Sequence, residues 1–271
     1  MKLKKTLCAL ALFGIPAVAV ANVIRSSKVV PIVDVRSGYL LGASRGKNWI
    51  KPQATAPQIK GGETYRLLES KNSSNKAVGS KPRTDEAPCV DTFFIEIKPR
   101  KGAIAVGGSW NAMPRAPQTL SNNSAVYRNI VAAILKKNKI QPNVKITQIM
   151  RVDLEGDGKD EVLISATNHK GYAGSLNSIS PRSLKNEYSM LLLRKVVGGK
   201  VVTQMLDEEY YVKDKDFNAP NVFTLAGVWD LNGDGRMEIV THGRYYEGNW
   251  TTVYEMRSSK AVKVLEEGCG A

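Results

Sequence analysis

The stretch Asp153-Leu154-Glu155-Gly156-Asp157-Gly158-Lys159-Asp160-Glu161 decides how the second half of this chain is interpreted. The same order of acidic residues and glycines returns as Asp230-Leu231-Asn232-Gly233-Asp234-Gly235-Arg236-Met237-Glu238. Carboxylates in so short a loop repel one another unless a positive charge lies between them. Two copies of one acidic, glycine-bearing loop therefore indicate a pair of metal sites.

The spacing favours calcium as the metal. A Ca²⁺ ion takes about six to eight oxygen ligands, and a short loop supplies them from alternating positions. Glycine at the sixth position, Gly158 or Gly235, permits the sharp turn that an ion requires. The predicted ligands are Asp153, Glu155, Asp157, the Lys159 carbonyl and Glu161 in the first loop, and Asp230, Asn232, Asp234, the Arg236 carbonyl and Glu238 in the second.

The flanking sequence argues against an EF-hand, which needs a glutamate at the twelfth position and a helix on each side. The twelfth residues here are Ile164 and Thr241. Residues 146–152, 162–166 and 222–229 are rich in β-branched and apolar side chains, which is typical of strands. We therefore expect strand-loop-strand calcium sites, with a pair of acidic hairpin turns as the alternative.

Residues 153–161 and 230–238 resemble the calcium loops of FG-GAP or VCBS repeats, the blades of integrin-alpha-like β-propellers. The resemblance covers roughly residues 144–267. It implies a mainly β fold of antiparallel, propeller-like meanders, in which each loop joins two strands of a blade around a structural ion. Only two repeats are visible, and the FG and GAP residues that name the family are not evident.

Each loop lies in a unit that is expected to form a four-stranded antiparallel meander, at about residues 144–206 and 222–267 of the domain 144–271. Turns at Gly198-Gly199 and Ser258-Ser259 join the last two strands of the units. The first unit is longer, because Asn168 to Asn186 has no counterpart in the second. This insertion is either functional or merely mobile.

Residues 22–143 are expected to form a basic, β-rich region that ends in a helix. They form either further blades or a separate small N-terminal sheet, which would make the fold α+β. Residues 70–88 are expected to be a loop or linker. Candidate strands lie at residues 29–35, 38–41, 64–68, 92–97 and 103–106.

One amphipathic helix is expected at Ser124–Lys137, followed by Asn138 and Pro142. Its apolar face is expected to pack into the core. That face consists of Val126, Tyr127, Ile130, Val131, Ile134 and Leu135.

Residues 1–21 resemble a bacterial Sec-type signal peptide, with lysines before the apolar run Leu7 to Ala21 and small residues at its end. We therefore expect a periplasmic or secreted protein with no transmembrane segment after cleavage; an uncleaved anchor is the alternative. Cleavage leaves two cysteines, Cys89 and Cys269. An oxidising compartment favours a disulfide between them.

Charge is distributed unevenly along the chain. Residues 22–150 hold 21 lysines and arginines against 7 acidic residues, whereas residues 151–271 hold 15 against 18. The basic half is expected to attract an anionic glycan, lipid or protein at the cell envelope. No motif indicates specific recognition of nucleic acid.

Signatures of catalysis are sparse. The two histidines, His169 and His242, do not occupy equivalent repeat positions, and no G-x-S-x-G, H-E-x-x-H or Walker motif occurs. The expected function is non-catalytic binding, with structural Ca²⁺ in both loops. One alternative is an extracellular hydrolase or lyase acting on a polymeric glycan or phosphoester, which needs a carboxylate or histidine cluster away from the loops. Another is an envelope assembly factor.

Overall fold

The computed structural model describes residues 28–69, 75–85, 87–173 and 179–270. The predicted signal peptide, residues 1–21, lies outside the described residues, as does the middle of the predicted insertion at residues 174–178. The described chain forms four antiparallel sheets and two short α-helices, so the prediction of a mainly β fold is confirmed. No helix in this part of the chain is long and apolar enough to cross a membrane.

The first large sheet is built from the N-terminal region. It has seven strands in the order β3-β2-β1-β9-β4-β5-β8. The short helix α1 (Pro52–Thr55) and a 3₁₀ turn at Ala56–Gln58 follow β3. The strands are β1 (Val30–Asp34), β2 (Leu40–Arg45), β3 (Asn48–Ile50), β4 (Thr64–Leu68), β5 (Lys76–Gly79), β8 (Ile97–Lys98) and β9 (Ile104–Val106).

The C-terminal region forms two further sheets, each an antiparallel meander. The five-stranded sheet consists of β10 (Gln118–Thr119), β11 (Ile146–Val152), β12 (Glu161–Thr167), β13 (Tyr188–Val197) and β14 (Lys200–Tyr210) in sequence order. The four-stranded sheet consists of β15 (Val222–Trp229), β16 (Glu238–Arg244), β17 (Asn249–Arg257) and β18 (Lys260–Cys269). The two expected meanders are therefore present, β11–β14 and β15–β18.

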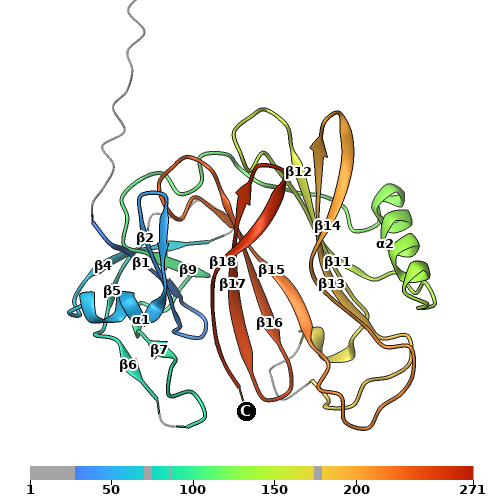
Figure 1. The fold of residues 1–271 in the computed structure, drawn as a ribbon, viewed down its shortest axis with the longest axis horizontal. Coiled ribbons are helices and arrows are strands. Elements are labelled where there is room, and N and C mark those ends of the chain that lie inside the picture. The colour runs from blue at the N-terminus through green and yellow to red at the C-terminus, as the bar shows by residue number, and fades with distance from the viewer. Residues whose placement is uncertain (1–27, 70–74, 86, 174–178, 271) are drawn as a thin grey trace, which may run out of the picture.

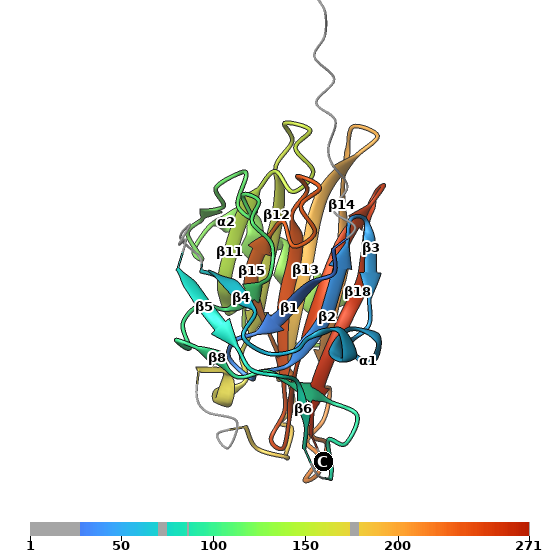
Figure 2. The ribbon, with the colours of Figure 1, turned by 90° about the vertical axis from the view of Figure 1, so that its left-hand side faces the viewer.

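The three large sheets lie side by side, with the four-stranded sheet in the middle (Figure 1). One apolar core runs through all of them, joining Ile32 and Leu41 of the seven-stranded sheet, Leu225 and Leu265 of the four-stranded sheet and Leu191 of the five-stranded sheet. Figure 2 looks onto the seven-stranded sheet with the other two behind it. Among the described residues the sheets do not close into a propeller.

Helix α2 (Ala125–Lys137) confirms the one helix that the sequence predicted. It covers the outer face of the five-stranded sheet (Figure 1). Val131 and Leu135 are fully buried, and Tyr127 and Ile134 pack beside them. The expected apolar face is wrong at one position, because Val126 is 66% exposed on the solvent side of the first turn.

The N-terminal region contains more strands than the sequence predicted. The described parts of residues 70–88, expected to be a loop or linker, contain β5 and β6 (Arg83–Thr84). The expected strand at residues 92–97 is divided, because its first part, β7 (Phe93–Phe94), pairs with β6 and its last part, β8, pairs with β5. Such two-residue pairings are too short for an alternating pattern to show.

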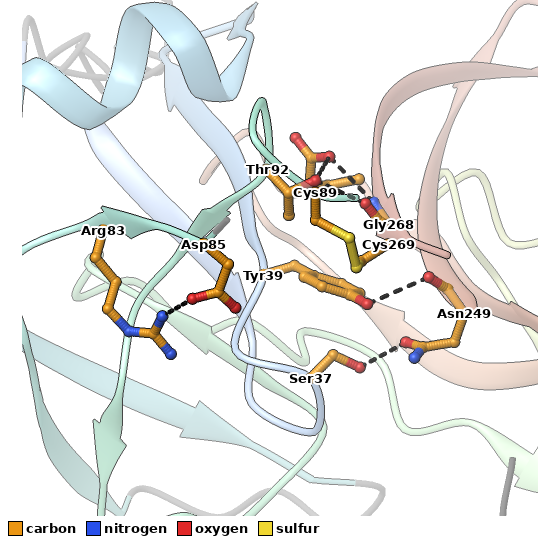
Figure 3. The surroundings of a disulfide bond; sticks show 10 residues. Ser37, Tyr39, Arg83, Asp85, Cys89, Thr92, Asn249, Gly268 and Cys269 are labelled. Atoms are coloured by element: carbon orange, nitrogen blue, oxygen red, sulfur yellow. Dashed lines mark hydrogen bonds and ion pairs between the residues drawn. A yellow bond between two sulfur atoms is a disulfide. The ribbon is translucent and has the colours of Figure 1, made fainter. Parts of the chain in front are cut away.

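A disulfide between Cys89 and Cys269 ties the N-terminal region to the last strand (Figure 3). The Cα atoms are 5.5 Å apart across a sequence separation of 180 residues. Beside it, the Thr92 hydroxyl donates to the Gly268 carbonyl at 2.8 Å, and the Ser37 hydroxyl donates to the Asn249 side-chain oxygen at 2.7 Å. The predicted disulfide is therefore confirmed, and it joins the connection between β6 and β7 to the last strand of the four-stranded sheet.

Replacing both cysteines, Cys89→Ser with Cys269→Ser, should lower the free energy of unfolding by about 2 to 5 kcal/mol. The crosslink closes a long loop, so its removal restores conformational freedom to the unfolded chain. Urea unfolding of the oxidised wild type and of the double variant measures the loss. Adding a reductant should lower the stability of the wild type and leave the variant unchanged; equal stability of the oxidised wild type and the variant would contradict this account.

Candidate metal centre

The two acidic loops occupy equivalent places in the two meanders. Residues 153–160 connect β11 to β12, and residues 230–237 connect β15 to β16. Gly158 and Gly235 have φ angles of 79° and 85°, in the left-handed region that favours glycine. Both loops therefore turn in the way that the repeated sequence predicts.

The hydrogen bonds of the two loops also correspond. One carboxylate oxygen of Asp153 accepts the Gly156 N–H at 2.7 Å and the other accepts the Gly158 N–H at 2.9 Å. In the second loop Asp230 accepts the N–H groups of Gly233 and Gly235 at 2.6 and 2.9 Å. The first aspartate thus organises each turn from inside.

The closing glutamates repeat one another in the same way. Glu161 accepts the Leu154 N–H at 3.0 Å, and Glu238 accepts the Leu231 N–H at 2.7 Å. Each glutamate is 1% exposed. The sequence repeat therefore corresponds to one local structure formed twice, with a buried carboxylate at its base.

The two loops lie against each other. The Met237 N–H donates to the Leu154 carbonyl at 2.8 Å. The Arg115 guanidinium donates to the carbonyls of Leu154 and Gly235 at 3.0 and 2.8 Å, and also to the Asp153 carbonyl. One arginine therefore spans both loops through their main chains.

Basic side chains from outside the first loop bind its carboxylates. Lys195 of β13 donates to Glu161 at 3.0 Å and to Glu155, and Arg236 of the second loop also donates to Glu155. The Lys195 side chain is 9% exposed. Burial raises the pKa of Glu161 to about 7, and the charges of Asp157 and Asp153 add to this rise. A buried ammonium thus neutralises two of the four predicted carboxylate ligands of this loop.

The second loop has an acid where the first has this lysine. Val162 pairs with Arg194 and Ile239 pairs with Tyr254, so the antiparallel register sets Lys195 beside Glu161 and Glu255 beside Glu238. Burial raises the pKa of Glu238 well above its ordinary value, and the charges of Asp230, Asp234 and Glu255 reinforce the rise.

Within the described residues, Asp230, Asp234 and Glu238 form no ion pair. The nearby Arg66 feels the charge of Asp230 but donates its hydrogen bond to the Trp110 carbonyl. Burial also raises the pKa of Asp230, against hydrogen bonds from Gly235 and Gly233 that lower it. The carboxylates of this loop therefore have no salt-bridged cation in the described chain, and burial favours the protonated forms of Asp230 and Glu238.

The donor set of the second loop fits a hard cation better than that of the first. Asp230, Asn232, Asp234 and Glu238 offer side-chain oxygens from alternating positions, which is the arrangement that Ca²⁺ takes. In the described chain no three acidic, histidine or cysteine side chains already surround a common point. An ion would therefore have to draw these carboxylates together.

The remaining predicted ligands lie in the two loops, but their carboxylates bond to neighbouring residues of the same loop. Asp157 is exposed and pairs with Lys159 at 3.4 Å, and its carboxylate accepts the Lys159 N–H at 3.0 Å. Asp234 accepts the Arg236 N–H at 2.9 Å in the corresponding way. The roles of the Lys159 and Arg236 carbonyls stay predictions.

Sequence reasoning missed three residues that complete this centre. Lys195 and Arg115 supply the charges, and the Trp110 indole N–H donates to the Asp230 carbonyl at 2.8 Å. Lys195 could have been found only from the β12–β13 register, which the insertion between those strands conceals. Arg115 and Trp110 lie in the irregular connection from β9 to β10, where no periodicity marks them.

Comparison of the chain with protein-family models, with curated proteins and with solved structures found no match. The resemblance to FG-GAP and VCBS repeats thus rests on the two loops and their strands.

Replacing Lys195 with glutamine should destabilise the protein in calcium-free buffer by about 3 to 5 kcal/mol, because it leaves the buried Glu161 without its ammonium partner. Urea unfolding in the presence of a chelator measures this loss. Lys200→Gln, at the exposed start of β14, is the matched control and should change stability little. A loss as small as that of the control would show that Lys195 is not the counter-charge of this loop.

Proposed function

We propose that the protein is a secreted or periplasmic, calcium-stabilised binding protein of the FG-GAP/VCBS type, and that it acts without catalysis. The repeated loop geometry supports this proposal. Two turns of nine residues share glycine angles, aspartate hydrogen bonds and a buried closing glutamate. Each turn also joins two strands of an antiparallel meander, as the repeat family implies.

The observation that carries the calcium proposal is the uncompensated second loop. Asp230 and Glu238 are 2% and 1% exposed and form no ion pair within the described chain. Buried carboxylates are costly unless they are protonated, paired or bound to a metal. A bound Ca²⁺ would offset two of the three negative charges of Asp230, Asp234 and Glu238 and fix the β15–β16 turn.

We propose unequal roles for the two loops. The first is held by Lys195 and Arg236 and binds calcium more weakly, because an ion must compete with an ammonium already bonded to Glu155 and Glu161. The second has Glu255 in the equivalent place and binds calcium more tightly. The ion is structural in both, since each loop closes its shell with protein oxygens.

The propeller-like arrangement is part of the same proposal. Neighbouring propeller blades stack face to face, each burying the surface that a single blade cannot bury alone. The two meanders and the seven-stranded sheet share one continuous apolar core in this manner. The disulfide agrees with an oxidising location outside the cytoplasm.

The proposed partner is an anionic glycan, lipid or protein at the cell envelope. Residues 22–150 hold 21 basic against 7 acidic residues, and the described part of this range contains the seven-stranded sheet and helix α2. A surface of one sign of charge attracts such partners over distances of about a Debye length.

Calcium should raise the melting temperature, and the second loop should account for most of the rise. A site with Kd on the order of 10⁻⁴ M gains about 1.4 kcal/mol from millimolar calcium, or roughly 3 to 5 °C for a chain of this size. Asp234→Ala should remove most of the shift and Asp157→Ala only a smaller part. Thermal melts with calcium and with chelator measure it.

Two further variants sharpen this test. Asp160→Ala is the matched control, because Asp160 faces Arg151 at 3.4 Å rather than the predicted ligands and should leave the calcium response intact. Glu255→Lys should weaken the response by giving the second loop the lysine of the first. A calcium shift that survives Asp157→Ala combined with Asp234→Ala would overturn the metal assignment.

A further inference from the structure

An open hollow with a basic lining lies where the seven-stranded sheet meets the four-stranded sheet. Its volume is about 490 Å³, and its charged lining residues are Arg36, Arg100, Lys101 and His242. The lining contains no aspartate or glutamate. Arg36 follows β1, Arg100 and Lys101 lie between β8 and β9, and His242 lies in β16. Residues far apart in the sequence thus create one cationic recess.

A second hollow of about 260 Å³ adjoins the first, since Val35 and Arg100 line both. It adds Arg83 and Lys98 to the basic lining, and its one acid, Glu96, is paired with Lys98 at 3.0 Å. We call the two adjoining hollows the recess; most of its basic side chains come from the basic half of the chain.

Behind His242 a chain of hydrogen bonds leads to a buried acid. The Thr251 hydroxyl donates to the Asp34 carboxylate at 2.8 Å, and the His242 Nδ1 atom lies 3.0 Å from the same hydroxyl oxygen. Asp34 and Thr251 are both 0% exposed. The other carboxylate oxygen of Asp34 accepts the Arg36 N–H at 2.9 Å. The chain holds the imidazole in a fixed orientation.

This arrangement determines the tautomer of His242. A hydroxyl has one hydrogen, and here it points to the carboxylate, so the oxygen of Thr251 must accept from His242. Nδ1 therefore bears the proton and Nε2 keeps its lone pair. Within the described chain no protein atom hydrogen-bonds Nε2. Burial lowers the pKa of His242, an effect that Asp34 opposes and Arg36 reinforces.

The Arg100 side chain is held across the recess by the main chain beside it. Its Nε donates to the Val35 carbonyl at 3.1 Å, and one terminal nitrogen donates to the Arg36 carbonyl. A guanidinium has five N–H donors, so donors remain for a ligand. No charged partner of Arg36 or Lys101 is present among the described residues.

We propose that this recess binds phosphate, with Arg36, Arg100 and Lys101 holding the oxyanion and His242 Nε2 accepting a hydrogen bond from its O–H group. Cationic donors alone accept any oxyanion. Because His242 also lines the hollow, its Nε2 lone pair would favour an anion that offers a proton. A phosphate ester with a hydroxyl on the neighbouring carbon has the same chemistry. This inference rests on the proposed binding role and names a ligand for it, but it does not depend on calcium.

The test compares hydrogenphosphate with sulfate. Both are tetrahedral dianions at about pH 8, above the ordinary pKa of histidine, but only hydrogenphosphate has an O–H. ¹⁵N NMR of the imidazoles is practical because the chain has two histidines, and His242→Gln identifies the signal of His242. We expect an Nδ1–H tautomer in the free protein and a saturable shift of Nε2 on titration with phosphate.

Sulfate should bind at least about tenfold more weakly than phosphate, because it has no O–H group and its oxygen lone pairs would face the lone pair of His242 Nε2. Glycerol 1-phosphate, whose hydroxyl adjoins the ester, is the third probe. Binding of phosphate alone identifies the free ion as the ligand, and tighter binding of the ester identifies a phosphate ester. Equal binding of sulfate and phosphate, an Nε2–H tautomer, or no saturable shift would overturn the proposal.

Variants separate this site from general charge attraction. Arg36→Gln and Lys101→Gln should each weaken phosphate binding by about tenfold. Lys47→Gln, which removes the same charge from the turn between β2 and β3 outside the hollow, should leave it unchanged. An equal loss in all three variants would overturn the site. Titrations in the presence of chelator keep this outcome independent of the calcium proposal, which is judged by the melting shift.

Discussion

Burial of carboxylates where the two acidic loops meet is the constraint on which the C-terminal half depends. Glu161 and Glu238 stand at the bases of neighbouring turns, each fully buried, and each turn is held by hydrogen bonds to its first aspartate. Arg115 fastens the two turns through their carbonyls. Glu161 and Glu238 are also the first residues of β12 and β16, so each buried carboxylate lies where its meander enters the second strand.

The chain solves this electrostatic problem in two ways. In the first meander the strand next to the glutamate supplies Lys195, so the protein provides its own counter-charge. In the second meander the equivalent place holds Glu255, which pairs with Arg257 at 2.8 Å, so the neighbouring strand supplies no basic side chain to Glu238. A lysine is always present but loses side-chain entropy when it is held in place. With a bound ion, the free energy of unfolding depends on the ion concentration in solution. Under the proposed calcium assignment, this asymmetry predicts a larger stabilisation of the second meander than of the first.

The local structure of the repeats could be predicted from sequence because it depends on neighbours in the chain. Glycines at fixed positions and apolar runs around them predicted the turns, and β11 and β15 begin and end where the runs do. The compensating charges could not be predicted, because Lys195 reaches Glu161 through a strand pairing across an insertion. The seven-stranded sheet was predicted only in pieces, since its short strands pair out of sequence order, β1 with β9 and β5 with β8.

The proposed ligand recess lies between two sheets, where buried charge has a different role from its role in the loops. Its residues come from β16 and from the connections after β1 and β8, and the buried Asp34, Thr251 and His242 chain links the seven-stranded to the four-stranded sheet. Asp34 is a further buried acid, but its hydrogen bonds lead to His242, which lines the hollow, rather than to a lysine. The loops therefore place buried charge inside one turn, whereas the sheet junction places it behind a histidine that lines a hollow. The proposed calcium ligands and the proposed phosphate recess share no residue, so a change in one site need not alter the other.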